Sequence, residues 1–459
     1  MNVLFLIPPS PDKRNIIRLV ECGHETKAAY LCQPNDYLII SSLLTAEDNA
    51  SLIDGTADRL IESEFLIELG GQQPDLVFFA LASSCWESDY RIFQEVRRLL
   101  PSVPLYLIGD VFLEDNYLDF ILPQCEGVVF IPQLLDLKAM VEKAKAGNVK
   151  LPGLRTLSSK DDVPTNKAQQ VITGIPRHEL FQKKGYIFPF ARHFRFTTVT
   201  TMWGCPFSCF YCNMRALPPV VRSWQDVVLE LEYVQKLGIK EIYIYDRAFG
   251  FPSDNVNNLL DEMIKRFKFS WSCFFHPQMY KPKLLDKMYA AGCHTIIIGL
   301  ESADQASLKQ YQRNVKADRI SQLLEHANRL GMDVCADFMI GLEHETEEDI
   351  LRTIDYACNL PIDFLSLNVA CPFPGSGIRE KKVADGEMVF GQEGFDNFAR
   401  SGVMSESSIA SDRIIKLRDE WVRSFYLRPG YILRRLKKTK TLEHLLLQCY
   451  QMFVMFTKK

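Results

Sequence analysis

The stretch Trp203-Gly204-Cys205-Pro206-Phe207-Ser208-Cys209-Phe210-Tyr211-Cys212 places three cysteines within eight residues. Their spacing is C-x3-C-x2-C. Three thiolates this close can hold three irons of a 4Fe–4S cluster, which usually takes four cysteine ligands. The fourth iron is then open to another ligand. The spacing therefore predicts a cluster with chemistry at its open iron, and Cys205, Cys209 and Cys212 are its metal ligands and catalytic residues.

A partial zinc site is the other interpretation of three neighbouring cysteines. Zinc sites of this kind usually add a fourth Cys or His nearby, and none follows closely in this sequence. A chain of this length also needs no metal to stabilise its core. We therefore favour the cluster.

The composition of the 459-residue chain is that of an ordinary globular protein of two or three domains. Hydrophobic residues make up 47% and charged residues 24%, and the net charge of -4 does not indicate a nucleic acid as partner. The 13 cysteines form no regular framework, which favours a reducing cytoplasm over secretion. The N-terminal residues lack a basic n-region and are predicted to form a first strand, and no apolar run is long enough to span a bilayer.

Residues 1–148 alternate between apolar, β-rich runs and helical patterns. Near-continuous apolar strands between helices are typical of a parallel sheet covered on both faces, so we expect a five-stranded, doubly wound, Rossmann-like α/β domain. Such domains bind ligands at the carboxyl ends of their strands, near a topological switch point. The expected strands are Val3–Ile7, Ala50–Ile53, Asp75–Leu81, Pro104–Ile108 and Gly127–Ile131, and the clearest helices are Ser88–Leu100 and Leu134–Ala146.

After a polar, proline-containing linker over residues 149–195, the alternation resumes over residues 196–380. Six β/α units predict a partial (β/α)6 barrel, whose chemistry belongs on the loops after the strands. The cysteine stretch directly follows the first of these strands. Residues 381–459 are predicted to form a C-terminal helical domain. The expected barrel strands are Phe196–Met202, Glu241–Tyr245, Ser270–Phe275, Thr295–Leu300, Val334–Ile340 and Phe364–Val369, and the helices include Gln225–Leu237, Asn255–Phe267 and Ala317–Leu330.

The cysteine spacing resembles that of radical S-adenosylmethionine (SAM) enzymes. In that family the open iron binds the amino and carboxylate groups of SAM, and the aromatic residue before the last cysteine, here Tyr211, lies near the adenine. Ile298–Ser302 ends the fourth barrel strand, where the family carries a Glu that bonds the ribose or amino group of SAM. The resemblance gives this role to Glu301, with Ser302 beside it. Phe338–Thr346 resembles the I-x-G-L-P-G-E-T segment, whose backbone contacts the adenine around Gly341, although Glu343-His344 replaces Pro-Gly.

Other segments resemble the cobalamin-dependent branch of this family. That branch joins a cobalamin-binding Rossmann-like domain to the radical SAM barrel and a C-terminal helical cap. The common G-G-E after the second barrel strand is missing, and Tyr245–Phe249 resembles the D-x-x-F variant instead, which makes Asp246 a SAM-positioning residue. Trp271–Cys273, the run from Met288 to Cys293 and Phe425–Pro429 also resemble members of this branch. The resemblance covers almost the whole chain.

The N-terminal domain lacks the D-x-H-x-x-G pattern whose His ligates cobalt, because His24 has neither the Asp before it nor the Gly after it. The resemblance therefore implies a cobalamin without a histidine ligand from the protein. Asp54 and Gly109 lie in turns after strands, where glycine permits close backbone contact, and are expected near the corrin or its nucleotide tail. Trp86 either lies against the lower corrin face or packs at a domain interface. A vestigial sheet that binds nothing is the alternative for the whole domain.

The resemblance implies a C-methyltransferase with a 4Fe–4S cluster, SAM and cobalamin. A 5′-deoxyadenosyl radical made from SAM would remove a hydrogen from an unactivated substrate carbon, which would then take a methyl group from methylcobalamin. The alternative is a cobalamin-dependent relative that forms or contracts a ring, or catalyses another oxidative rearrangement. Methylthio transfer to RNA is disfavoured, because the chain lacks a basic RNA-binding tail and its N-terminal cysteines, Cys22, Cys32, Cys85 and Cys125, are not spaced for a second cluster. The expected partners are a small-molecule or peptide substrate and an electron donor such as flavodoxin or ferredoxin.

The end of the chain combines the basic run Arg434–Lys438 with an apolar stretch over Leu445–Phe456. Such a composition is compatible with contact to a membrane surface or a lipid-like substrate. A cap helix packed on the barrel, with a solvated basic edge, is the interpretation that we favour.

Overall fold

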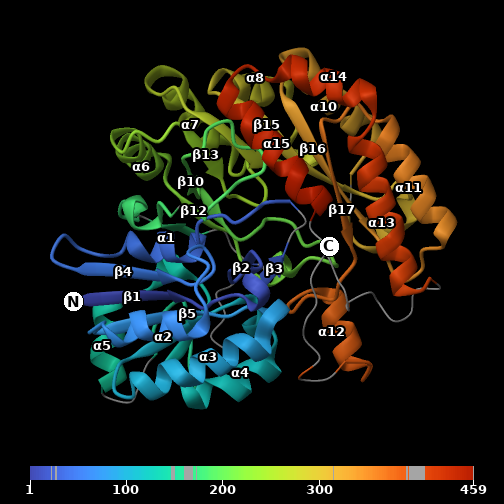
Figure 1. The fold of residues 1–459 in the computed structure, drawn as a ribbon. Coiled ribbons are helices and arrows are strands. Elements are labelled where there is room, and N and C mark those ends of the chain that lie inside the picture. The colour runs from blue at the N-terminus through green and yellow to red at the C-terminus, as the bar shows by residue number, and fades with distance from the viewer. Residues whose placement is uncertain are drawn as a thin grey trace.

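The structure is a computed structural model. It describes the chain except residues 22, 26–27, 146–149, 160–168, 172, 184, 314, 389–390, 392–408 and 458–459. Two six-stranded sheets form the centre of the molecule, one from each half of the chain, and helices cover them (Figure 1). The predicted α/β architecture, with a Rossmann-like sheet, a partial barrel and C-terminal helices, is confirmed.

The first sheet has five parallel strands in the order β4-β1-β5-β6-β7. After β1 the chain adds β4 on one side of it, and then β5, β6 and β7 in turn on the other side. The direction of strand addition therefore reverses between β1 and β5, which is the topological switch point. A short antiparallel edge strand, β8 (Leu154–Arg155), comes from the segment expected as a linker. The parallel strands are β1 (Asn2–Ile7), β4 (Asn49–Asp54), β5 (Leu76–Ala80), β6 (Leu105–Ile108) and β7 (Gly127–Val129).

The two faces of this sheet have different environments, because side chains alternate along each strand. Val3 and Phe5 share one core with Leu38 of α1 and with barrel residues such as Tyr243. Leu4 shares the other core with the outer helices α2, α3 and α4. The inner face is therefore continuous with the barrel. The helices are α1 (Asn35–Ser41), α2 (Glu62–Gly70), α3 (Trp86–Leu99), α4 (Asp115–Ile121) and α5 (Leu137–Lys145).

The second sheet is parallel throughout, in the order β10-β13-β14-β15-β16-β17, as a partial barrel requires. The order follows the sequence, so each strand lies beside the next one along the chain. Its strands are β10 (Phe196–Val199), β13 (Glu241–Ile244), β14 (Ser270–Phe274), β15 (Cys293–Glu301), β16 (Asp333–Ile340) and β17 (Phe364–Val369).

The first barrel strand is shorter than the predicted Phe196–Met202. It ends at Val199, because the backbone N–H groups of Thr201 and Met202 donate to the Asp246 carboxylate instead of to a neighbouring strand. Residues 202–203 form β11 (Met202–Trp203), which pairs with β12 (Val220–Arg222). β12 pairs in turn with β9 (Gln169–Val171), so the segment expected as a linker contributes a strand here as well.

The barrel helices lie outside the sheet, as their amphipathic patterns predict. α6 begins at a Ser223 side chain that accepts the Asp226 N–H, and α11 begins at a capping box formed by Thr346 and Asp349. These helices are α6 (Trp224–Lys236), α7 (Ser253–Arg266), α8 (Pro282–Ala290), α9 (Gln305–Gln310), α10 (Ala317–Leu330) and α11 (Glu347–Asn359).

In the described part of the chain after the barrel, the helices are α12 (Gly377–Ala384), α13 (Ser411–Tyr426), α14 (Pro429–Lys438) and α15 (Leu442–Thr457). α14 is held by Arg435 and Lys438, which pair with Asp333 at the start of β16 and with Asp363 just before β17. The basic run therefore docks on the barrel through part of its charge. Of the described helices, none is long and apolar enough to cross a membrane.

Candidate active site

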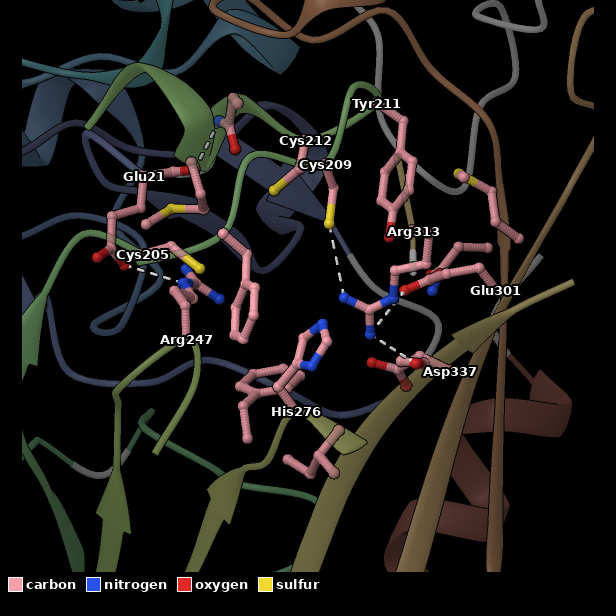
Figure 2. Close-up of a pocket in the computed structure, with 18 of the residues that line it drawn as sticks. Glu21, Cys205, Cys209, Tyr211, Cys212, Arg247, His276, Glu301, Arg313 and Asp337 are labelled. Atoms are coloured by element: carbon pink, nitrogen blue, oxygen red, sulfur yellow. Dashed lines mark hydrogen bonds and ion pairs between the residues drawn. The ribbon is translucent and has the colours of Figure 1, made fainter. Parts of the chain in front are cut away.

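A cavity of about 270 Å³ lies at the carboxyl ends of the barrel strands, the edge where β/α barrels hold their chemistry. Cys205, Cys209, Cys212, Tyr211 and Glu301 all line it (Figure 2). The structure therefore brings together the three cysteines and two of the predicted SAM contacts.

The cysteine loop begins at Gly204, directly after β11 of the three-stranded sheet β11-β12-β9. Gly204 has a φ of 74°. A Cβ at this position would lie 2.3 Å from the carbonyl oxygen of Pro218, so the turn requires glycine. The Cys212 N–H donates to the carbonyl of Cys209 and closes the loop at 3.1 Å. Burial raises the pKa of Cys205 to about 11 and raises that of Cys212 further. The thiols of Cys205 and Cys212 are thus protonated at neutral pH, and iron ligation would displace these two protons.

The three thiols fit a cluster better than a single ion. Within the described parts of the chain, no three Cys, His, Asp or Glu side chains lie close enough together to hold one metal ion. A cubane cluster occupies the space between its ligands, so it can be held by sulfurs that surround a cavity, as Cys205, Cys209 and Cys212 do.

Glu301 reaches the cavity through an irregularity at the end of β15. Gly299 pairs with Asp337 and Glu301 with the next residue, Phe338, so Leu300 is an extra residue in the strand. Bulges of this kind redirect side chains beside active sites. Glu301 also adopts a positive φ of 66°, which is uncommon outside glycine. Burial raises the pKa of its carboxyl group, although the charge of Arg313 and the nearby Tyr211 hydroxyl act in the other direction.

Arg313 is a functional candidate that the sequence patterns missed. This buried side chain lies in the loop between α9 and α10 and lines the cavity. Its Nη1 donates to the Sγ of Cys209 at 3.6 Å, and its Nη2 donates to the carbonyl of Gly299 at 2.6 Å. Nη2 also lies 3.8 Å from Oε1 of Glu301, while Nε is buried without a hydrogen-bond partner. A free donor on a buried cation is suited to an anionic ligand group.

Two further titratable side chains line the cavity, and both are neutral over much of the pH range. Burial and the nearby Glu301 raise the pKa of Asp337 to about 7. Burial and Arg313 lower the pKa of His276 to about 2. His276 stacks on Phe207 of the cysteine loop, with ring centroids 3.8 Å apart. Its Nδ1 accepts the Gln278 N–H at 3.2 Å, so the proton of the neutral ring is on Nε2.

The other predicted SAM contacts lie outside the lining of this cavity. Asp246 accepts bonds from Thr201 and Met202, so it holds the approach to the cysteine loop, and burial raises its pKa to about 6. Ser302 faces Thr353 of α11, with the two hydroxyl oxygens 3.4 Å apart. Gly341 donates its N–H to Glu345 at 2.8 Å. These residues shape the elements around the site.

The residues predicted to contact cobalamin are engaged inside the N-terminal domain. Asp54 accepts hydrogen bonds from the N–H groups of Thr56 and Ala57 and from the Tyr186 hydroxyl. A Cβ on Gly109 would lie 2.2 Å from the carbonyl oxygen of Leu81, so this glycine serves internal packing. Neither residue lines the cavity.

Trp86 is buried against Tyr90, Phe112, Tyr117 and Phe120, so it packs within the domain instead of at its boundary. The sheet edge nearby is filled by Arg18 of β2 (Ile16–Arg18). Arg18 pairs with Asp89 at 2.7 Å and donates to Thr56 at 2.8 Å. Asp54, Gly109 and Trp86 therefore all make contacts within their own domain, and a role for them in cobalamin binding stays a prediction. His24 has a side chain outside the described part of the chain.

The N-terminal domain reaches the cavity at a residue that sequence analysis did not find. Glu21, which follows β2, is buried and lines the cavity beside Cys205. Its carboxylate pairs with Arg247, from the loop after β13, at 3.0 Å. Its backbone carbonyl accepts the Asn213 side-chain amide at 2.6 Å, directly after the cysteine loop. Tyr245–Phe249 contained the signal for Arg247, but nothing in the sequence indicated Glu21.

Known proteins show the same organisation. An uncharacterized methyltransferase from Pyrococcus horikoshii, PH0819, is 25% identical over 453 residues, which cover 95% of this chain and 94% of that protein. The radical SAM methyltransferase TsrM from Kitasatospora setae, solved with cobalamin and a 4Fe–4S cluster, superposes with a TM-score of 0.64 at 17% identity, over 84% of this chain and 75% of TsrM. OxsB, a cobalamin-dependent SAM radical enzyme, gives 0.60 at 13% identity, over 99% of this chain and 71% of OxsB.

The two structural likenesses establish the fold. Residues 199–357 match the Radical SAM superfamily, and this range contains the cysteine loop and the strands that carry most of the cavity. A match over this range, with the three cysteines on the cavity wall, identifies residues 199–357 as a radical SAM domain.

Proposed function

We propose that this protein is a cobalamin-dependent radical SAM C-methyltransferase. The observation that carries the proposal is one cavity that three cysteines, Glu301 and Arg313 of the barrel share with Glu21 of the N-terminal domain. A cavity lined by both the N-terminal domain and the barrel is expected for an enzyme in which each domain binds one of the reacting cofactors. The fold likeness to TsrM and the similarity to a methyltransferase along nearly the whole chain support the choice of methyl transfer.

The chain would bind and orient the reacting groups. When bound, the cluster and SAM supply an initiating radical, and the protein supplies position and electrostatics. Cys205, Cys209 and Cys212 would hold the cluster. Arg313 offers its unpartnered donor to the carboxylate of SAM, and Glu301 and Tyr211 face the same space. The electron donor, a flavodoxin or ferredoxin, and the small-molecule or peptide substrate belong to the proposal as well.

The only support for cobalamin is the likeness in fold to TsrM and OxsB. The contacts that Asp54, Trp86 and Gly109 make lie within their own domain and do not by themselves indicate a corrin. The domain nonetheless borders the cavity through Glu21. A group held by this domain would therefore face the cluster across the Glu21–Arg247 pair.

The deciding experiment measures cobalt, iron and the absorbance spectrum of protein purified without oxygen and supplied with hydroxocobalamin. We expect about one corrinoid per chain beside the broad absorbance of the cluster. Cluster without corrinoid would leave a radical SAM enzyme and rule out the cobalamin-dependent reaction. The matched control is a Cys205→Ala/Cys209→Ala/Cys212→Ala variant, which should lose the cluster absorbance and keep the corrinoid.

A cobalamin-dependent reaction without methyl transfer is the second candidate, because the likeness to OxsB, a cobalamin-dependent SAM radical enzyme, extends over 99% of this chain and supports the cofactors without specifying methyl transfer. Each methyl group that SAM donates leaves one S-adenosylhomocysteine, whereas a rearrangement without methyl transfer produces no S-adenosylhomocysteine. Stoichiometric S-adenosylhomocysteine during turnover would support methylation, and its absence would support the alternative.

A further inference from the structure

An apolar stripe runs along the outer face of α15. Its members are Leu442, Leu446, Tyr450 and Phe453, with 71%, 51%, 43% and 66% of their surface exposed. Steps of four, four and three residues keep them on one face of the helix. At 1.5 Å per residue the stripe is about 17 Å long. Exposed apolar surface of this extent on one element indicates a partner.

The opposite face of α15 is fixed to the protein, so the stripe cannot turn inward. His444 and Leu447 are buried. The Gln451 side chain exchanges two hydrogen bonds with the backbone of Ala29, at 2.7 and 2.9 Å. Met455 packs against the barrel core. Figure 1 shows α15 lying across the open front of the second sheet, at the surface of the molecule.

Basic side chains lie along the chain just before the stripe. Lys437 and Lys440, at the end of α14 and in the connection to α15, are exposed, and no carboxylate of the described residues pairs with them. The one acidic residue of α15, Glu443, accepts hydrogen bonds from His193 and from the Phe194 N–H. The end of α14 and the described residues of α15 therefore offer positive charge and no unpaired carboxylate.

We propose that α15 and the end of α14 bind peripherally to an anionic lipid bilayer. The stripe would insert among the headgroups parallel to the membrane plane, and Lys437 and Lys440 would contact lipid phosphates. A helix with an apolar face and adjacent lysines is the usual element for this mode of binding, and α15 is too short to span.

A second copy of this chain fits the stripe less well. A two-fold contact places the same patch on both subunits, so both contacting surfaces would carry the same lysines and neither would supply a carboxylate to neutralise them. An anionic surface neutralises these charges instead. The placement goes beyond the proposed function, because it puts the enzyme at a membrane surface whatever its reaction.

The test is flotation of the purified holoprotein with vesicles of phosphatidylcholine, with or without roughly one third phosphatidylglycerol. We expect flotation with the anionic vesicles that weakens as salt rises. Leu446→Glu/Phe453→Glu should lower the partition coefficient about tenfold or more, and Lys437→Glu/Lys440→Glu should remove most of the salt dependence. The control is Ile67→Glu, at a 75% exposed apolar residue on α2, which should float like the wild type.

Circular dichroism confirms that each variant is folded, and light scattering without lipid reports self-association. Equal flotation of wild type and Leu446→Glu/Phe453→Glu would overturn the proposal, as would no flotation at low salt. A dimer that the same variant converts to a monomer would instead assign the stripe to a second copy. None of these measurements uses SAM, corrinoid or substrate, so their outcome is independent of the proposed reaction.

Discussion

At the scale of single residues, the site depends on where two charged side chains meet. Glu301 is redirected by an extra residue in β15, and Arg313 reaches back from the following loop. The two side chains approach to 3.8 Å, with Arg313 buried and Glu301 only partly exposed, so each lowers the cost of removing the other from water. Arg313 keeps one N–H without a partner, which leaves it ready for a carboxylate.

Replacing Arg313 should separate SAM binding from cluster binding. A charge-assisted hydrogen bond contributes about 1.5–3 kcal/mol, so Arg313→Met should raise the dissociation constant for SAM about tenfold to a hundredfold. The iron and sulfide content should stay near that of the wild type, because the three cysteines remain. Equilibrium dialysis with labelled SAM measures the effect. Lys309→Met removes an exposed cation of α9 and should change little; unchanged SAM affinity in Arg313→Met would contradict the assignment.

At the scale of elements, α14 is attached to the barrel through a cluster of opposite charges. Arg435 and Lys438 lie 2.9 Å from the same oxygen of Asp333, and Arg192 lies 3.4 Å from the other oxygen. These cations hold the pKa of Asp333 at about 2, below its ordinary 3.8, although burial acts in the other direction. The ionised carboxylate therefore stabilises the folded protein above about pH 4, and this stabilisation is lost as the pH falls toward 2.

Asp333→Asn should lower the free energy of unfolding by about 3 kcal/mol at pH 7, because it leaves buried cations short of a partner. The difference between wild type and variant should shrink as the pH falls below about 4, where the wild-type carboxylate begins to lose its advantage. Urea unfolding at several pH values measures both effects. Asp385→Asn, which removes an exposed carboxylate paired with Lys381, should cost less than about 1 kcal/mol. A difference for Asp333→Asn that stays constant with pH would contradict the charge argument.

At the scale of the whole molecule, the two halves share a core and a cavity. Phe188, from the segment between the sheets, stacks on Tyr243 inside the barrel with ring centroids 4.3 Å apart. Phe188 belongs to the same core as Phe5 of the first sheet. The Glu21–Arg247 pair then joins residues 226 positions apart at the cavity wall. The N-terminal domain and the barrel are therefore packed as one unit around the site.

Glu21→Gln should loosen this junction. The substitution leaves Arg247 with the Tyr245 hydroxyl and without its carboxylate, which should cost about 2–3 kcal/mol. Hydrogen exchange should become faster in β2 and in the cysteine loop, since Glu21 contacts both regions. Glu62→Gln breaks the surface pair with Arg91 and serves as the control. Protection in β2 and in the cysteine loop equal to that of the wild type would show that the pair does not hold the domains together.

The sequence by itself determined most of the secondary-structure elements and the loop that brings three cysteines together. The expected strands appear in both sheets, several within one residue of their predicted bounds, because apolar alternation and helix caps are local properties. The cysteine spacing is equally local, since eight residues of one loop place all three thiols on the cavity.

The tertiary structure alone decided which other side chains reach the cavity. Asp246 lies at the carboxyl end of a barrel strand, as predicted. Its carboxylate, however, accepts hydrogen bonds from the backbone of Thr201 and Met202, which follow β10. Asp54, Gly109 and Trp86 follow strands of the first sheet at its carboxyl edge, as predicted. In the structure they contact residues of the N-terminal half of the chain and do not line the cavity. Arg313 and Glu21 come from loops whose paths depend on a bulge and on contact between distant segments. The physical reason is that a strand's period tells which way a side chain points, whereas its partners are set by segments far away along the chain.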